Sequence, residues 1–211
     1  MSDRAKLTTI GVAALILAVA VAVVLMAGGS DETTPTVETR QGNIDPPGEV
    51  LEPGGSASVV METSEGSFTI ELDTETSPKT TNSFAYLAEE GFYDGLGFHR
   101  IVPDFVIQGG DPKGDGSGGP GFKTVEKPDP DLTYDLGVVV MAKSGAEKPG
   151  TSGSQFFIVT GSGGASLPPE YAYVGRVSEG LDVVETIGRL GGPDEQPTKD
   201  VVIEEATLER G

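Results

Sequence analysis

The chain has 211 residues, and 33 acidic against 14 basic side chains give it a formal net charge of −19. A surface of that sign repels nucleic-acid phosphates, so we expect no nucleic-acid partner. The sequence contains no cysteine and one histidine, which excludes disulfides, thiolate chemistry and a multi-histidine metal site within one chain. Any chemistry is therefore expected from arginine, glutamine, aromatic groups, carboxylates and backbone.

Residues 1–27 are predicted to form a short cytoplasmic stub and a membrane-spanning helix. The 21 residues after Lys6 carry no charge, and a helix of that length spans roughly 30 Å, about the hydrocarbon thickness of a bilayer. Arg4 and Lys6 precede the run, whereas Asp31 and Glu32 follow it. The positive-inside rule then predicts a single-pass protein of the cell membrane whose remaining residues are extracytoplasmic.

The alternative for this segment is a cleaved signal peptide, which would give a secreted protein. The apolar part of a signal peptide usually has about 7–15 residues, fewer than this run. Leu25 before Ala27 also makes a poor small-residue cleavage site. The sequence therefore favours a retained anchor and leaves cleavage as the second possibility.

Residues 28–56 are predicted to be a disordered tether, and residues 57–211 a folded domain. The tether is rich in Gly, Pro, Thr and acidic residues, and it lacks the apolar periodicity of a core. A flexible chain of that length has an end-to-end distance on the order of 30 Å. The domain would thus be held just off the membrane surface.

The domain opens with a predicted hairpin over residues 57–74, in which two alternating runs meet at Ser64–Gly66. A helix is expected over residues 77–91, with Ser77 as N-cap, Pro78 at the first position and Gly91 at the end. Strand-like runs follow at residues 98–102, 105–110, 136–142, 154–160 and 171–177, then a second helix at 178–190 and a last strand at 200–209. Many short strands with two helices indicate a mainly β barrel or sandwich.

The sequence contains partial matches to two common enzyme motifs. "GDGSGG", residues 114–119, formally matches a dinucleotide-binding loop, but Pro120 and Gly121 follow where a helix should begin. His99 could act as the base of a serine hydrolase, but the sequence has no G-x-S-x-G motif. Neither motif therefore supports a function.

The segments "FHRIVPDFVIQGGDP", residues 98–112, and "TSGSQFFIVT", residues 151–160, closely resemble the two defining stretches of cyclophilin-type peptidyl-prolyl cis-trans isomerases. The resemblance extends over nearly all of residues 57–210 and keeps its motifs in order. It implies a closed eight-stranded antiparallel barrel capped by two helices. It also implies an enzyme that needs neither metal nor cofactor.

The resemblance implies catalytic roles for Arg100, Gln108 and His99, with His99 serving as a pocket wall and hydrogen-bonding group. Arginine suits the reaction because a fixed cation can donate to the proline nitrogen only when the twisted amide has lost its resonance. The substrate-binding residues implied by the resemblance are Phe105, Val106, Ala142, Lys143, Gln155, Phe157, Leu167 and Tyr171. Phe156 and Phe157 are adjacent, so one ring is expected in the core and the other in the site.

Three positions depart from the family's usual residues. Ser166 stands where many members carry tryptophan, Tyr171 where a second histidine is frequent, and Lys143 where asparagine is frequent. A smaller and more open pocket wall predicts weak cyclosporin binding.

The predicted function is the acceleration of rotation about X-Pro bonds in exported or unfolded proteins. Its partners would be proline-containing polypeptide segments and the membrane. The rival hypotheses are a non-catalytic proline-binding module and a holding chaperone of the cell envelope.

Overall fold

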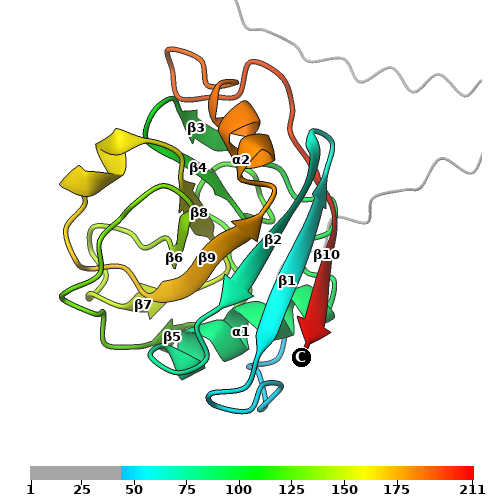
Figure 1. Ribbon diagram of the computed structural model, residues 1–211, viewed down its shortest axis with the longest axis vertical. Coiled ribbons are helices and arrows are strands. Elements are labelled where there is room, and N and C mark those ends of the chain that lie inside the picture. Colours follow the sequence, from blue (N-terminus) through cyan, green and yellow to red (C-terminus); the bar gives the residue numbers. More distant parts are fainter. Residues whose placement is uncertain (1–43) are drawn as a thin grey trace, which may run out of the picture. The chain divides into compact units, whose positions relative to one another are not determined.

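The computed structural model describes residues 44–211 (Figure 1). The predicted anchor at residues 1–27 and the tether up to residue 43 lie outside the described residues. Within residues 44–211, no helix combines the length and the apolar character needed to cross a membrane.

A single antiparallel sheet of eight strands forms the body of the domain, in the order β10-β1-β2-β9-β6-β8-β4-β3. Its strands are β1 (Ala57–Thr63), β2 (Gly66–Leu72), β3 (Arg100–Val102), β4 (Val106–Gly109), β6 (Val138–Met141), β8 (Phe156–Val159), β9 (Tyr173–Glu179) and β10 (Ile203–Arg210). A second, two-stranded sheet pairs β5 (Thr124–Val125) with β7 (Thr151–Ser152), and the sequence showed no strand signal at either.

The mainly β fold is confirmed, but the predicted closed barrel is wrong. The sheet is a curled half-barrel, because its edge strands β10 and β3 do not pair with each other in the described part of the chain. One isolated bridge, between Gly97 and Val202, joins the segments that precede them. Farther along, the N–H of Ile101 in β3 donates to the carbonyl of Glu195 at 2.8 Å. A loop thus occupies the edge that a closed barrel would give to a strand.

The strands of the predicted hairpin bury alternate side chains, as a half-exposed sheet requires. In β1, Val59 and Met61 are fully buried, whereas Val60 between them is not. All four residues of β8 are buried, because one face of this strand meets the main core and the other a second apolar cluster. Phe156 lies in the main core and Phe157 in the second cluster, which confirms the predicted split of these two rings.

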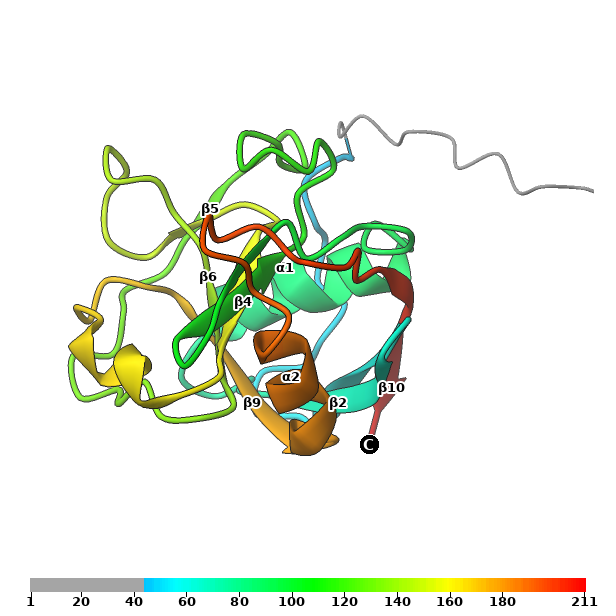
Figure 2. The ribbon, with the colours of Figure 1, turned by 90° about the horizontal axis from the view of Figure 1, so that it is seen from above.

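Two helices cover the two ends of the curled sheet (Figures 1 and 2). Helix α1 (Pro78–Glu89) packs near β9 and β10, and helix α2 (Leu181–Gly188) packs near β2, β3 and β4. A short 3-10 turn, η1 (Ser162–Ser166), follows β8. Both predicted helices are confirmed, and Pro78 occupies the first turn of α1 as expected.

The cap of helix α1 differs from the prediction. Ser77 stands at the N-cap position but makes no capping hydrogen bond through its side chain. The carboxylate of Glu126 instead accepts from the backbone N–H groups of Lys79 and Thr80, at 2.7 and 3.1 Å. A carboxylate at this end satisfies free N–H donors and complements the helix dipole. The cap is therefore supplied by a residue 46 or more positions away in the chain.

Residues 44–56, which were predicted to belong to the disordered tether, lie against the domain. The side chain of Asn82 in α1 accepts from the N–H groups of Val50 and Leu51, at 2.8 and 3.0 Å, and donates to the carbonyl of Gly48 at 2.7 Å. Ile44, Val50 and Leu51 also pack on the main core. A few apolar residues are enough to hold this segment in place, because the folded domain supplies the apolar surface that buries them.

Candidate active site

The site begins as a row of side chains across neighbouring strands. Arg100 of β3 pairs with Gln108 of β4, and Gln108 pairs with Phe157 of β8. Phe157 in turn pairs with Val140 of β6. Directly paired residues project from the same face of a sheet. The sheet register therefore places a cation, an amide and an aromatic ring side by side.

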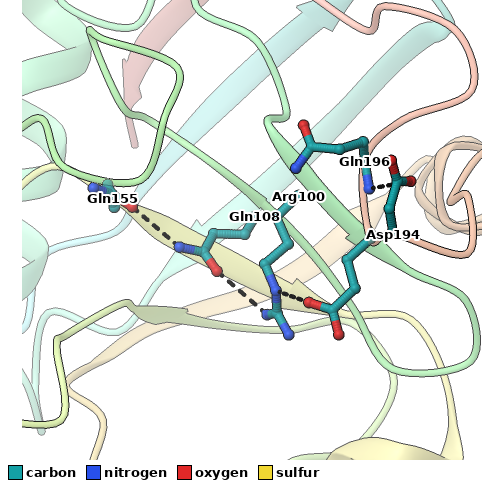
Figure 3. Close-up of polar contacts among 6 residues, drawn as sticks. Arg100, Gln108, Gln155, Asp194 and Gln196 are labelled. Atoms are coloured by element: carbon teal, nitrogen blue, oxygen red, sulfur yellow. Dashed lines mark hydrogen bonds and ion pairs between the residues drawn. The ribbon is translucent and has the colours of Figure 1, made fainter. Parts of the chain in front are cut away.

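Hydrogen bonds connect the polar members of this site (Figure 3). Nη1 of Arg100 donates to Oε1 of Gln108 at 3.5 Å, and Nε2 of Gln108 donates to Oε1 of Gln155 at 3.0 Å. Nε2 of Gln155 donates to the carbonyls of Gly116 and Gly118, at 3.0 and 2.9 Å. The loop at residues 116–118 thus sets the direction of the Gln155 amide, which in turn orients Gln108 toward the guanidinium of Arg100.

An apolar cluster lies next to this polar line. Val106 and Phe157 are two of its buried members, with exposed fractions of 2% and 5%. Phe105, Leu167 and Tyr171 pack against them and are half-buried. The ring of Tyr171 stands edge-on to Phe157, with centroids 5.0 Å apart and an interplanar angle of 87°. Five of the predicted substrate-binding residues therefore belong to one apolar cluster.

A groove of about 690 Å³ continues from the polar line. Four of the predicted substrate-binding or catalytic residues line it: Gln108, Ala142, Lys143 and Gln155. The backbone N–H of Ala142 donates to the carbonyl of Gln155 at 2.8 Å. This N–H is therefore not available to a bound peptide.

Lys143 takes part in the site in a way that the sequence did not predict. Its side chain is only 6% exposed, and its ammonium lies 3.0 Å from a carboxylate oxygen of Glu170. The same ammonium lies 5.8 Å from the centroid of the Tyr171 ring. A buried ammonium needs such a partner. Lys143 and Glu170 thus support the aromatic wall formed by Tyr171.

His99 precedes β3 and is half-buried. Its Nδ1 is buried and has no hydrogen-bond partner among residues 44–211. Burial lowers the pKa of the imidazole from its usual 6.5, although the carboxylate of Asp111 acts in the opposite direction. The imidazole is therefore neutral at pH 7.

Two carboxylates of the site, Glu170 and Glu195, were not identified from the sequence. Oε2 of Glu195 accepts from Nε of Arg100 at 2.6 Å, although the two residues are 95 positions apart. Both glutamates lie in loops outside any periodic pattern. No local signal in the sequence distinguishes them from the other acidic residues of the chain.

Comparison with known proteins identifies the family. Residues 58–208 match the model of the cyclophilin type peptidyl-prolyl cis-trans isomerases. A peptidyl-prolyl cis-trans isomerase-like 1 of Gibberella zeae is 39% identical over 158 residues, which are 72% of this chain and 95% of that protein. A peptidyl-prolyl cis-trans isomerase of Schizosaccharomyces pombe is 45% identical over 139 residues, which are 64% of this chain and 86% of that protein.

Solved structures agree with this assignment. The crystal structure of a cyclophilin type peptidyl-prolyl cis-trans isomerase of Cryptosporidium parvum has a TM-score of 0.67 and 31% sequence identity, covering 74% of this chain and 99% of that one. A second structure of that protein, obtained in the presence of the dipeptide Ala-Pro, has a TM-score of 0.66. Family model, relatives and fold all lead to one conclusion: the chain belongs to the cyclophilin-type peptidyl-prolyl cis-trans isomerases.

Proposed function

We propose that this protein accelerates cis-trans isomerisation of X-Pro bonds in exported or unfolded polypeptides, through Arg100 beside an apolar proline slot. The observation that carries the proposal is the cross-strand row in which Gln108 separates Arg100 from Phe157. A proline ring seated against Phe157 would bring its peptide bond toward the guanidinium. The dipeptide used with the relative of Cryptosporidium parvum supports proline-containing segments as the class of ligand.

The reaction needs no covalent step. Resonance in the C–N bond opposes rotation, and an X-Pro bond isomerises unaided in tens to hundreds of seconds. In the twisted state the nitrogen lone pair is localised and can accept a hydrogen bond from Arg100. That bond is absent from the planar ground state, so it lowers the barrier rather than only tightening binding. A 10⁵-fold acceleration requires a reduction of about 7 kcal/mol.

The neighbouring residues would orient the reacting groups. Gln108 holds one end of the guanidinium, and its own direction is set by Gln155. Phe105, Val106, Leu167 and Tyr171 would bury the proline ring with Phe157, and His99 would form part of the wall. Lys143 would contact the extended peptide through its backbone.

We also propose that the domain acts outside the cytoplasm, held at the membrane by residues 1–27. The support is the uncharged run after Lys6, with basic residues before it and acidic residues after it. Protease protection in intact cells, combined with the intact mass of the purified protein, tests both the topology and the retention of the segment. A mature protein that begins after residue 27 would overturn the anchor in favour of secretion.

The isomerase proposal is tested by exchange NMR of an X-Pro peptide with the full-length chain and its Arg100→Ala and Phe105→Ala variants. We expect strong acceleration by the wild-type protein that collapses in Arg100→Ala. Binding without acceleration would instead indicate a proline-reading module. Suppression of aggregation that persists in Arg100→Ala, without acceleration by the wild type, would indicate a holding chaperone.

A further inference from the structure

The guanidinium of Arg100 has a second side-chain partner besides Gln108. Nε of Arg100 donates to Oε2 of Glu195 at 2.6 Å, and the two side chains are 34% and 51% exposed. The two partners contact different nitrogens, because Glu195 accepts from Nε and Gln108 accepts from Nη1. The guanidinium is therefore held at two of its three nitrogens, by an amide on its own sheet and by a carboxylate from a loop.

The backbone of Glu195 is anchored to the strand that carries Arg100. The carbonyl of Glu195 accepts from the N–H of Ile101 at 2.8 Å. Its loop is closed by a hydrogen bond from the N–H of Gly192 to the carbonyl of Gln196 at 2.8 Å, and by another from Thr198 to Leu190 at 2.7 Å. The loop of Glu195 is thus fixed by backbone hydrogen bonds. From this loop the carboxylate of Glu195 reaches Arg100, the residue next to Ile101.

The backbone of Glu195 adopts a conformation that glutamate disfavours. Its φ is +64°, in the left-handed region that glycine enters freely and that costs other residues free energy. A glycine would suit this backbone better than a glutamate does. Strain of this kind points to a function when the side chain acts on a site. Here the side chain contacts the residue proposed to stabilise the twisted amide.

The two contacts leave one end of the guanidinium available. Glu195 occupies Nε and Gln108 occupies Nη1, whereas Nη2 donates to no group among residues 44–211. Two fixed nitrogens define the plane of a guanidinium and hence the direction of the third. Without these contacts, the long arginine side chain would sample many rotamers. Each reaction with a bound peptide would then cost the conformational entropy of ordering that side chain.

We propose that Glu195 is a positioning residue of the isomerase, which fixes the guanidinium plane of Arg100 so that Nη2 faces the proline nitrogen in the twisted state. This inference rests on the proposed function. A pair as exposed as this one contributes little to stability. The carboxylate therefore acts on the rate, and the strained backbone of Glu195 is retained at the expense of stability.

The test uses the full-length chain, in detergent because of the predicted anchor, with two variants of Glu195. Glu195→Gly removes the carboxylate and relieves the left-handed strain, whereas Glu195→Gln keeps the acceptor and the strain but removes the charge. Asp194→Asn is the matched control, because Asp194 lies in the same loop and its carboxylate accepts from the N–H of Gln196 at 3.3 Å rather than from Arg100. Rates come from exchange NMR of an X-Pro peptide, and stability from Tm.

We expect Glu195→Gly to lower kcat by about tenfold with KM nearly unchanged, because a group fixed for the transition state is lost. Its Tm should equal or exceed that of the wild type, so misfolding would not account for the loss. Glu195→Gln should retain more of kcat than Glu195→Gly. The Nε–H signal of Arg100 in ¹⁵N spectra should lose its protection from solvent exchange in Glu195→Gly. Asp194→Asn should match the wild type in all four respects.

An Arg100→Ala background separates this inference from the proposed function. If Glu195 acts through Arg100, Glu195→Gly should cause no further loss in that background. Two results would overturn the positioning role alone. One is full activity of Glu195→Gly in a protein whose wild type is active. The other is a loss of activity from Glu195→Gly in the Arg100→Ala background that equals its loss in the wild-type background. A wild-type protein that binds the peptide but does not accelerate it would overturn the proposed function as well.

Discussion

Arg100 and Gln108 face each other across the β3–β4 ladder, with Nη1 of the arginine 3.5 Å from Oε1 of the glutamine. The pairing is symmetric about Asp104, which takes a φ of +57° in the turn between the two strands. A shift of one residue in this register would turn one of the two side chains to the other face of the sheet. The spacing of eight residues between Arg100 and Gln108 is therefore important because the β3–β4 hairpin places residues with that spacing directly opposite each other.

The first prediction concerns Gln108, the link between the guanidinium and Gln155. We expect Gln108→Leu to reduce kcat/KM by roughly tenfold, because Arg100 loses one of its two side-chain partners and the reacting geometry loosens. Exchange NMR of an X-Pro peptide measures the rate. Gln196→Ala is the control, since no hydrogen bond of its side chain is found in the described structure. A Gln108→Leu variant with wild-type kcat/KM would refute the orienting role of the amide.

The second prediction concerns Asn82, which holds residues 48–51 against helix α1. We expect Asn82→Ala to speed hydrogen exchange at the N–H groups of Val50 and Leu51 and to cost about 1–3 kcal/mol of local stability. Asn82→Asp keeps an acceptor for both N–H groups and should have a smaller effect. Isomerase activity should be unchanged in both variants. Equal exchange rates in wild type and Asn82→Ala would show that the side chain does not hold this segment.

The third prediction concerns pH, through His99. Burial lowers the pKa of this imidazole below 6.5 in the folded protein, so the unfolded chain binds the proton first as pH falls. The contribution of His99 to stability is therefore complete above pH 6.5 and is lost progressively below it, down to the folded-state pKa. Urea unfolding at several pH values between 5 and 7.5 should show this decline. His99→Gln, which cannot take up the proton, should show a shallower one; equal slopes would contradict the assignment.

The fourth prediction concerns cyclosporin and Ser166. Ser166 ends the η1 turn, and its hydroxyl donates to the carbonyl of Gly163 at 2.7 Å. Leu167, the next residue, packs against the apolar cluster that contains Val106 and Phe157. We expect calorimetry to give a Kd weaker than low nanomolar for the wild type, and Ser166→Trp to tighten it by about tenfold or more through added aromatic surface. A low nanomolar Kd of the wild type would show that serine in place of tryptophan at position 166 does not limit cyclosporin binding.

Much of the domain follows from patterns within short stretches of sequence. The alternation in β1 and β2, Pro78 at the start of α1 and the opposite faces of Phe156 and Phe157 depend on the geometry of one element. The motifs around Arg100 and Gln108 are equally local, and they led to the right family. These features could be predicted from the sequence because the backbone of each strand or helix sets its own side-chain periodicity.

Contacts between residues far apart in the sequence were decided by the tertiary structure alone. Glu126 caps α1, Glu195 holds Arg100 and Asn82 holds Val50, each across 32 or more positions. The opening of the barrel has the same origin, since the loop at Glu195 takes the edge of β3. In a chain with 33 acidic residues, many carboxylates could cap α1 or hold Arg100. The path of the folded backbone selects among them, because hydrogen bonds and ion pairs form only where that path brings their atoms within about 3 Å.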